Sequence, residues 1–387
     1  MRLWPFRQQA ARYTVSGIPP DALLVTEDAL RRNVEDLFVV RAQELRGAAI
    51  CWGGELRMEP ARALRLLEAR FKPFGYTPFL GREGDVTWIR ALPLADVVDT
   101  SSIRVNVVLF LLTVLSTLAA GYFFSPSFPF LTFNPLVEPG KLLDGVPFAF
   151  TLLAILGTHE FGHYFTARHY GASVSLPYFI PAPPPIFIFG TLGAVIRMRS
   201  PARDRNSLFD IAVAGPLAGL VVALLALWLG LTWSRVGAMP PGGGMQFGDS
   251  LLMRFFTWLV FGSIPQGMDI FVHPIALAGW VGLFVTALNL IPVGQLDGGR
   301  IAYALFGRHH RNVSLGTFVS LLLLGVVAQS MNWIVFAMLV FLLIGFHHAP
   351  PLDDLTPLSS RRYAVGVVCL ILLILLIPPV PIQLSGQ

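Results

Sequence analysis

From residue 101 onward, long apolar stretches alternate with short polar segments, and most of these stretches approach the ~20 residues that a helix needs to cross a bilayer. The stretch at residues 315–346 is too long for one span and is interrupted by polar residues at 329–332, which predicts two short spans joined by a tight turn. We therefore predict a polytopic α-helical membrane protein with about seven spans. They are expected at residues 103–124, 146–169, 208–231 and 270–291, twice within 315–346, and at 363–377.

Two apolar segments do not fit a simple span. Residues 173–199 contain five prolines, which exclude a continuous helix, and non-helical backbone is tolerated in a membrane only where protein or a cavity covers it. We interpret this segment as a re-entrant Pro-rich loop or hairpin that lines a site, with a strand at residues 193–199. Residues 251–261 are apolar but too short to span, and we expect them to be interfacial or re-entrant.

Residues 1–100 differ from the rest because charged residues are spread among short apolar segments, as in a soluble domain. Helices are predicted from Thr26 to about Arg46 and at residues 60–71, and strands at residues 47–56, 77–80 and 85–92. We therefore expect a small soluble α/β domain at residues 1–100, followed by a membrane domain at residues 101–387. The first domain carries no metal or nucleophile constellation, so a regulatory or docking module and a simple folding appendage are both open interpretations.

The composition supports the membrane class and limits the function. The chain is 54% hydrophobic and 13% charged, against about 25% charged residues in soluble globular proteins. The net charge of +5 comes mostly from arginine, and the basic clusters lie in short loops beside predicted spans, where they indicate topology and lipid contact rather than a nucleic-acid partner. The two cysteines, Cys51 and Cys369, lie in different domains, so neither a disulfide framework nor a thiolate zinc site is expected.

The distribution of basic residues predicts the orientation in the membrane. Arginines gather in the loops after the second and fourth predicted spans and before the last one, whereas the alternate loops hold only Lys141, Arg235 and Arg254. By the positive-inside rule this bias places residues 1–100 in the cytosol. Residues 1–7 lack the apolar core of a secretory signal, and no Ser/Arg-rich transit segment precedes the soluble domain, so the bacterial inner membrane is the expected location.

Candidate chemistry lies at the end of the second predicted span. His159 and His163 are four residues apart and so project from one face of the helix, as two metal ligands do, while Glu160 lies about 100° around it and is free to act on water activated by the ion. Ionisable residues inside a span indicate function by default. On this motif alone, two histidines that bond to backbone or ligate a haem are open alternatives.

Asp297 is the candidate for a third ligand. Two histidines and a water leave zinc one protein ligand short. Asp297 follows the fourth predicted span, where Pro292 stops the helix and Gly298 and Gly299 free the backbone. Because the predicted topology places both motifs near the cytosolic ends of their helices, the histidines and this carboxylate can meet at one depth.

These residues together resemble the site-2 protease family of intramembrane zinc metalloproteases, peptidase family M50. The family pairs His-Glu-x-x-His on one span with Asn-Pro…Leu-Asp-Gly on a later one, matched here by residues 159–163 and by Asn289, Pro292 and residues 296–299. Residues 214–216, Ala-Gly-Pro, resemble an element of the family's middle core helix, so the core spans are those at about 146–169, 208–231 and 270–291.

The Pro-rich loop is most similar to the cyanobacterial and chloroplast branch of the family. Two features differ from other members. Asn289 and Pro292 are separated by two residues, where many members have an adjacent Asn-Pro pair, and no PDZ-like insertion is present in the sequence pattern.

The resemblance implies one Zn²⁺ ion held by His159, His163 and Asp297, with Glu160 as the catalytic base and acid and Asn289 as an auxiliary residue that helps to orient the substrate. It implies an endopeptidase that hydrolyses peptide bonds in transmembrane helices of membrane proteins within the lipid bilayer. Such a helix must unwind before attack. The strand at residues 193–199 would then hold the unwound segment by strand addition, or else serve only as a packing hairpin.

Two other function classes would use the same residues differently. A transporter or channel would employ them for metal or proton handling, and inverted repeats would favour it, but the histidine motif has no duplicate in the other half of the chain. A catalytically silent scaffold is disfavoured by Glu160, which metal binding alone does not require.

The remaining histidines receive simpler interpretations. His273 is expected to be packed or interfacial, because it lies at the opposite side of the membrane from the site. The pairs at residues 309–310 and 347–348 are expected to be solvated or to face lipid headgroups, with a second metal site as the minor alternative.

Overall fold

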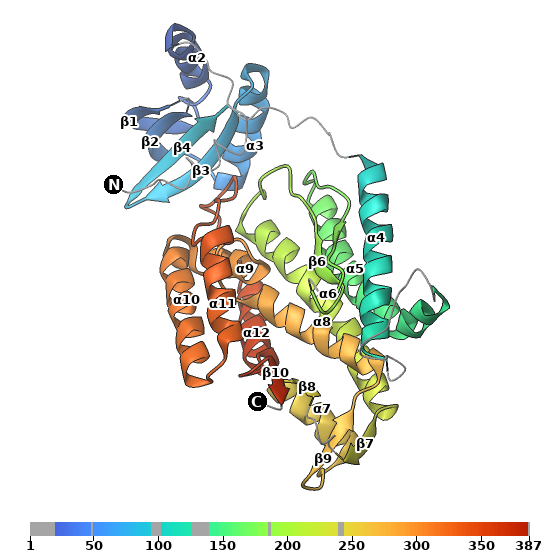
Figure 1. Cartoon of the computed structure of the whole chain (residues 1–387). Coiled ribbons are helices and arrows are strands. Elements are labelled where there is room, and N and C mark those ends of the chain that lie inside the picture. Colours follow the sequence, from blue (N-terminus) through green and yellow to red (C-terminus); the bar gives the residue numbers. More distant parts are fainter. Residues whose placement is uncertain are drawn as a thin grey trace.

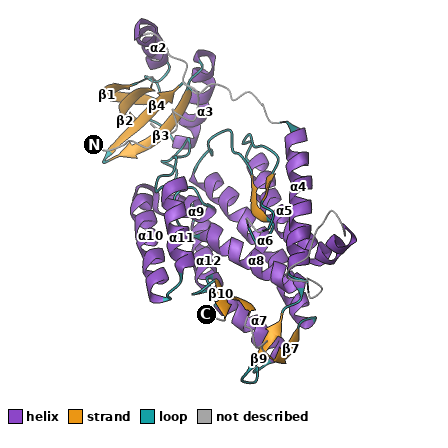
Figure 2. Ribbon diagram, in the orientation of Figure 1, coloured by secondary structure: helices purple, strands orange, loops and turns teal. Residues whose placement is uncertain are grey.

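The structure is a computed structural model with a small sheet domain at one end of a larger helical body (Figure 1). It describes residues 20–47, 49–93, 102–125, 139–184, 187–238 and 244–385. Residues 1–7, on which the expectation about a secretory signal rests, lie outside these ranges. Figure 2 shows that the small domain holds the largest sheet and that most helices lie in the body. The body also contains short two-stranded sheets.

The sheet domain packs its helices on a four-stranded antiparallel sheet with the strand order β1-β2-β4-β3. Its elements are α2 (Pro20–Arg32), β1 (Phe38–Arg46), β2 (Ala49–Leu56), α3 (Pro60–Phe71), η1 (Lys72–Phe74), β3 (Thr77–Glu83) and β4 (Val86–Leu92). The helix predicted at residues 60–71 and the three predicted strands are confirmed. Trp52, Phe71 and Ile89 are fully buried and give this domain a hydrophobic core of its own.

The helix predicted from Thr26 to about Arg46 is wrong at both ends. α2 begins at Pro20 and ends at Arg32, and residues 38–46 form β1, which pairs with β2 along its length. Phe38, Val39 and Val40 favour a strand, and the hydrogen bonds with β2 outweigh the helix propensity of the residues that follow. Phe38 is also buried in the core, which fixes the position of this strand.

The helical body has a helix at each predicted span. Its helices are α4 (Ile103–Phe123), η2 (Pro139–Gly145), α5 (Val146–His169), α6 (Arg205–Thr232), α7 (Leu251–Phe261), α8 (Pro274–Leu290), α9 (Asp297–Phe306), η3 (Gly307–His309), α10 (His310–Val327), α11 (Met331–Leu339), η4 (Val340–Ile344) and α12 (Ser360–Leu376). α8 begins later than the predicted span because residues 268–271 form a strand and Pro274 favours the first turn of a helix.

Short strands join the loops at the far end of the body from the sheet domain. β7 (Arg235–Ala238) pairs with β9 (Met268–Phe271), and β8 (Gly244–Phe247) pairs with β10 (Ile382–Ser385). The second pairing brings the end of the described chain back to the loop after α6, as Figure 1 shows.

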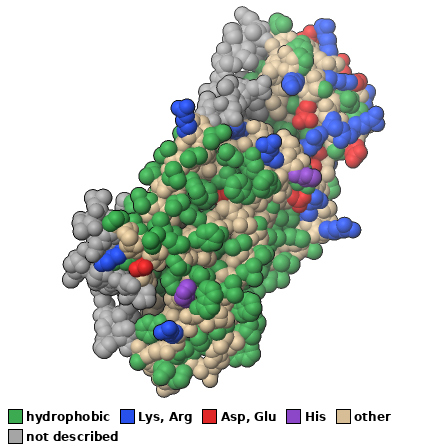
Figure 3. Space-filling view, turned by 90° about the vertical axis from the view of Figure 1, so that its right-hand side faces the viewer, with side chains coloured by type: hydrophobic (Ala, Val, Ile, Leu, Met, Phe, Trp, Pro, Cys, Tyr) green, Lys and Arg blue, Asp and Glu red, His purple; other side chains and the backbone are tan. Residues whose placement is uncertain are grey.

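The body has the surface of a membrane protein. Among the residues that the structure describes, four helical segments are long and apolar enough to cross a bilayer by length and composition, namely Ile103–Phe123, Pro139–His169, Arg205–Thr232 and Asp297–Val327. α7, α8 and the α11–η4 segment are apolar but shorter. Leu111, Val327 and Leu343 on the outer helices are 59%, 81% and 78% exposed. Figure 3 shows hydrophobic side chains covering the body, with most charged side chains gathered at the sheet-domain end. An apolar surface of this extent needs lipid around it.

The Pro-rich segment forms the predicted hairpin. β5 (Tyr178–Pro181) pairs antiparallel with β6 (Thr191–Val195), and Val174 bridges to Met198 further along the same hairpin. The strand predicted at residues 193–199 lies at residues 191–195, so it begins two residues earlier and ends four residues earlier than predicted. The hairpin is held against α4, where the Asn106 amide donates to the carbonyls of Leu176 and Pro177 at 3.2 and 2.9 Å.

The sheet domain is joined to the body by backbone hydrogen bonds. The Leu80 N–H of edge strand β3 donates to the Leu352 carbonyl at 2.7 Å, and the Asp354 N–H donates to the Leu80 carbonyl at 2.9 Å. Leu352 is itself bonded to the carbonyl of Ala202, which precedes α6, at 3.0 Å. Residues 352–354 thus extend the edge of the sheet and connect it to the start of a central helix.

Candidate metal centre

The site begins with the close approach of α5 and α6. A Cβ on Gly162 of α5 would lie 2.7 Å from the Ala214 carbonyl oxygen, and a Cβ on Gly219 of α6 would lie 3.1 Å from the His159 Cβ. At Gly215 an added Cβ would lie 2.2 Å from the His163 ring. Glycine at these positions lets the two helix backbones approach closely, so that α6 packs directly against the face of α5 that carries the histidines.

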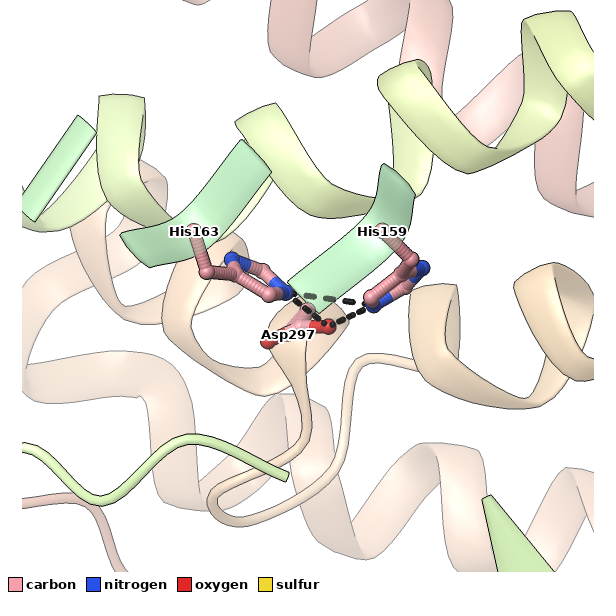
Figure 4. A group of neighbouring side chains, drawn as sticks. All are labelled: His159, His163 and Asp297. Atoms are coloured by element: carbon pink, nitrogen blue, oxygen red, sulfur yellow. Dashed lines mark hydrogen bonds and ion pairs between the residues drawn. The ribbon is translucent and has the colours of Figure 1, made fainter. Parts of the chain in front are cut away.

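His159 and His163 point their Nε2 atoms toward one position. The two Nε2 atoms are 3.1 Å apart, and both histidines are buried. The predicted spacing of four residues therefore places the rings side by side, as Figure 4 shows.

Asp297 reaches the same position from the other side. α8 ends at Leu290, the chain passes through an extended Ile291 and a left-handed Gly294, and Asp297 is the first residue of α9. Its Oδ2 lies 3.1 Å from the His163 Nε2 and 3.4 Å from the His159 Nε2. The predicted break after the helix is confirmed, whereas α9 was not predicted.

The glycines after Asp297 allow this turn to close. A Cβ on Gly298 would lie 2.0 Å from the Leu290 carbonyl oxygen, so only glycine fits there. A carboxylate at the first residue of a helix is also favoured by the helix dipole. The Arg300 Nη1 lies 3.9 Å from the Asp297 Oδ1, which leaves Oδ2 facing the histidines.

The donor set fits a divalent metal ion. The His163 Nδ1 lies 2.6 Å from the Ile211 carbonyl, which can only accept, so Nδ1 carries the proton and Nε2 presents a lone pair. That lone pair meets a carboxylate oxygen and a second imidazole nitrogen, and the three potential ligand atoms all lie within 4.8 Å of one another. Converging acceptors are stabilised by a cation, and two imidazoles with one carboxylate are a donor set that zinc uses in catalytic sites.

Glu160 and Asn289 flank these three residues. Glu160 is buried at 6% exposure, and its carboxylate accepts from the backbone amide of Ile196, just after β6, and lies close enough to His159 and Asp297 to interact electrostatically with both. The Asn289 side-chain nitrogen lies 3.3 Å from the His159 Nε2. The structure thus brings all five residues singled out from the sequence to one place.

Comparison with known proteins agrees with this geometry. The family model of peptidase family M50 matches residues 147–328, a region that contains α6, α8, all of α5 but its first residue, and all three converging side chains. The chain is similar to peptidase family M50 over this region. The resemblance to this family and to its chloroplast branch is therefore confirmed.

Several curated relatives match most of this chain. The Arabidopsis thaliana protein named "Probable zinc metalloprotease EGY2, chloroplastic" is 29% identical over 390 residues, which are 94% of this chain and 66% of the relative. The Oryza sativa subsp. japonica protein named "Probable zinc metalloprotease EGY1, chloroplastic" is 31% identical over 304 residues, 71% of this chain and 50% of the relative. The chain thus spans between half and two thirds of the length of these relatives.

Three groups at the candidate metal centre were not predicted from the sequence. The Ile211 carbonyl, the Gly162 contact with α6 and the Arg300 guanidinium all depend on packing between distant segments. Of the three, only the Gly162 contact has a local signal in the sequence. Gly162 lies inside the histidine motif, and a small residue on a predicted span is typical of close packing against another helix.

Two of the other histidines differ from expectation. His273 caps the N-terminus of α8, which agrees with a packed or interfacial position. The expectation that residues 309–310 and 347–348 are solvated or face lipid headgroups is wrong for His310, which is buried, and for His348, whose ring packs 4.9 Å from that of Tyr303. The reason is that residues 346–354 fold back under the sheet domain and cover the α9–α10 junction.

Proposed function

We propose that this chain is an intramembrane zinc endopeptidase that hydrolyses peptide bonds within the transmembrane segments of membrane proteins. The observation that carries the proposal is the convergence of His159, His163 and Asp297 beside the buried Glu160, inside an apolar helical body. The match to peptidase family M50 and the relatives named as probable zinc metalloproteases support it. We assign His159, His163 and Asp297 as the ligands of one Zn²⁺ ion and Glu160 as the catalytic residue.

When bound, Zn²⁺ polarises the scissile carbonyl and makes water acidic enough to lose a proton near neutral pH. The Glu160 carboxylate takes this proton from the attacking water and passes it to the nitrogen of the leaving amine. His163 is held in its ligand tautomer by the Ile211 carbonyl, at 2.6 Å. The amide of Asn289, 3.3 Å from His159, is placed to help orient the substrate.

The hairpin supplies a place for the unwound substrate. β6 pairs with β5 on one side, and in the described part of the chain no strand pairs with its other edge. Leu192 and Val195 on β6 are 62% and 50% exposed, and Ile196 places its amide at Glu160. A substrate segment added to this edge would run past the catalytic carboxylate in an extended conformation.

An apolar cleft between α4 and α5 supports access from the lipid. It has a volume of about 690 Å³, and Gly157 and Phe161 of α5 lie in its wall, within one turn of His159 and Glu160. A transmembrane helix that enters from the bilayer meets apolar side chains there, apart from Asn106, until it reaches the site.

The finer topology follows from the helices and the basic residues. We propose seven spans, formed by α4, α5, α6, α8, α10, α11 with η4, and α12, in a membrane domain at residues 101–387. We place the domain at residues 1–100 on the cytosolic side because the arginines cluster at that end. The bacterial inner membrane stays a prediction, and the chloroplast relatives make a plastid membrane the competing location.

The transporter or channel alternative is not favoured. It would use the same residues to carry a metal ion or protons, whereas the family match and the names of the relatives both point to peptide hydrolysis. The observation that separates the two is cleavage of a substrate by purified protein.

The proposal is tested with Glu160→Gln in purified full-length protein and a fluorescent transmembrane substrate. The variant should keep its zinc, because Glu160 is not a ligand, and should lose cleavage by about 10²–10⁴-fold, the usual contribution of a general base. The matched control is Glu55→Gln, a surface residue of the sheet domain that is ion-paired with Arg41. Undiminished cleavage by the Glu160 variant, or wild-type protein without zinc, would refute the assignment.

A further inference from the structure

A second cavity lies between the sheet domain and the helical body, away from the metal centre. It has a volume of about 680 Å³, and its walls are the β3–β4 turn on one side and the α9–α10 junction with residues 346–354 on the other. The volume is in the usual range of a small-molecule site. The backbone bonds at Leu80 hold the two walls together at one edge of this interdomain cavity.

The charges that line the interdomain cavity are unbalanced. Five arginines face two carboxylates, and both carboxylates are already ion-paired, Glu83 with Arg90 at 2.7 Å and Asp354 with Arg205 at 2.8 Å. Arg82 on one wall and Arg308 and Arg311 on the other are exposed, and none of these three forms an ion pair with another described residue. The cavity therefore holds a positive potential that an anion would neutralise.

His348 adds a buried ring nitrogen beside the backbone of Ala349. Its Nδ1 is buried and makes no hydrogen bond of normal geometry within the described ranges, while its ring packs against Tyr303 at 4.9 Å and His310 at 5.8 Å. Burial lowers the pKa of His348 to about 3, so the ring is neutral and able to donate one hydrogen bond. A ligand bound in the cavity would give this nitrogen a hydrogen-bond partner of normal geometry.

We propose that the interdomain cavity binds a phosphate-bearing anion, which bridges Arg82 of the sheet domain to Arg308 and Arg311 of the body. Guanidinium groups recognise phosphate oxygens with paired, charge-assisted hydrogen bonds, and the imidazole of His348 supplies a further donor. The cavity lies where the basic loops of the body gather, so either a soluble phosphate compound or a lipid headgroup can reach it.

Binding there has a structural consequence. Like charges on the two walls repel one another, and an anion between them changes this repulsion into attraction. The wall formed by the body is the end of α9, and α9 begins with Asp297 of the metal centre. The ligand thus ties the sheet domain to the helix that supplies the third potential ligand, which gives the sheet domain a regulatory role.

The experiment titrates purified full-length protein in a neutral detergent with inorganic phosphate, ATP and short-chain phosphatidylglycerol, using calorimetry and the shift of the thermal midpoint. We expect saturable binding of at least one probe. Arg82→Gln and the double variant Arg308→Gln/Arg311→Gln should each weaken it by about tenfold or more, since each removes a charged partner of a desolvated phosphate. Arg65→Gln, an exposed arginine of the same domain outside the cavity, should stay within about twofold of wild type.

The outcomes distinguish the sources and the failure. Binding of phosphate or ATP assigns a soluble ligand, and binding of phosphatidylglycerol alone assigns a lipid headgroup. Absence of binding for all three probes in the wild type, or an equal loss in the Arg65 control, overturns the proposal. The same titration on Glu160→Gln protein should give the wild-type result, so failure of the proposed proteolysis would leave this test intact.

Discussion

Replacing Gly215 by alanine tests the geometry of the metal centre without touching a ligand. The added Cβ would lie 2.2 Å from the His163 Nε2, 2.4 Å from its Cδ2 and 2.5 Å from its Cε1. Non-bonded carbon atoms rest at about 3.5–4.0 Å, so the imidazole or the helix must move by more than about 1 Å. Metal–ligand distances hold within about 0.2 Å, and a shift of this size would remove His163 from the ligand set.

The magnitude of the Gly215→Ala effect follows from two separate losses. Overpacking at a tight interface destabilises a protein by about 1–3 kcal/mol. Displacing His163 also breaks the hydrogen bond between its Nδ1 and the Ile211 carbonyl. Loss of such a hydrogen bond to a metal-ligating histidine lowers metal affinity by about 10–100-fold. We therefore expect zinc affinity to fall by at least this factor, with a lower thermal midpoint.

Gly157→Ala is the matched control for this variant. Gly157 lies in α5, six residues before His163, and an added Cβ would meet nothing within 4 Å. Alanine is favoured over glycine in a helix by about 1 kcal/mol, so this change should preserve zinc and leave stability equal or higher. The assay is zinc content by mass spectrometry during titration with a chelator, together with thermal unfolding. Equal zinc affinity in the two variants would show that the close approach of α5 and α6 at Gly215 does not position His163.

Three further predictions concern the ligands, the hairpin and the sheet domain. Asp297→Ala should lower zinc occupancy measured by mass spectrometry, and equal occupancy would remove this residue from the ligand set. Val195→Pro, together with Ile196→Pro, should abolish cleavage of a transmembrane substrate while Val195→Ala keeps it, and intact cleavage with both prolines would exclude strand addition. Burial raises the pKa of the Cys51 thiol to about 11, so alkylation of Cys51 at pH 9 should be slow in the folded protein and fast in denaturant. The contribution of this thiol to the stability of the fold should be lost as the pH rises from about 9 towards 11. Equal alkylation rates in the folded and denatured protein would contradict the burial of Cys51.

The parts of the site that the sequence predicts are those fixed by local geometry. The spacing of His159 and His163 determines that both lie on one helix face, and Pro292 with Gly298 determines that the chain turns before Asp297. The depth of these groups was predicted from the arginine pattern alone. The first two of these inferences use only residues that lie close together in the sequence, and the third uses only the positions of the arginines along the chain.

The parts that the sequence does not predict depend on contacts between distant segments. β1 was expected to be helical because its pairing with β2 is invisible to a helix pattern. His310 and His348 were expected to face solvent or lipid headgroups, because the packing of their rings against each other depends on how residues 346–354 fold back between the sheet domain and the body. The backbone bonds of Leu80 have no side-chain signal at all, since any residue but proline can make them.

The middle helix α6 shows why a site of this kind needs more than its ligands. None of the three converging side chains comes from α6, yet its Ile211 carbonyl orients His163, and its Gly215 and Gly219 leave room for both histidine side chains. α5 can place two buried imidazoles against α6 because the Nδ1–H of His163 donates to the backbone carbonyl of Ile211 on α6. Substitutions on α6 should therefore reproduce the loss of a ligand, and the order of their effects should follow how closely each position approaches an imidazole ring.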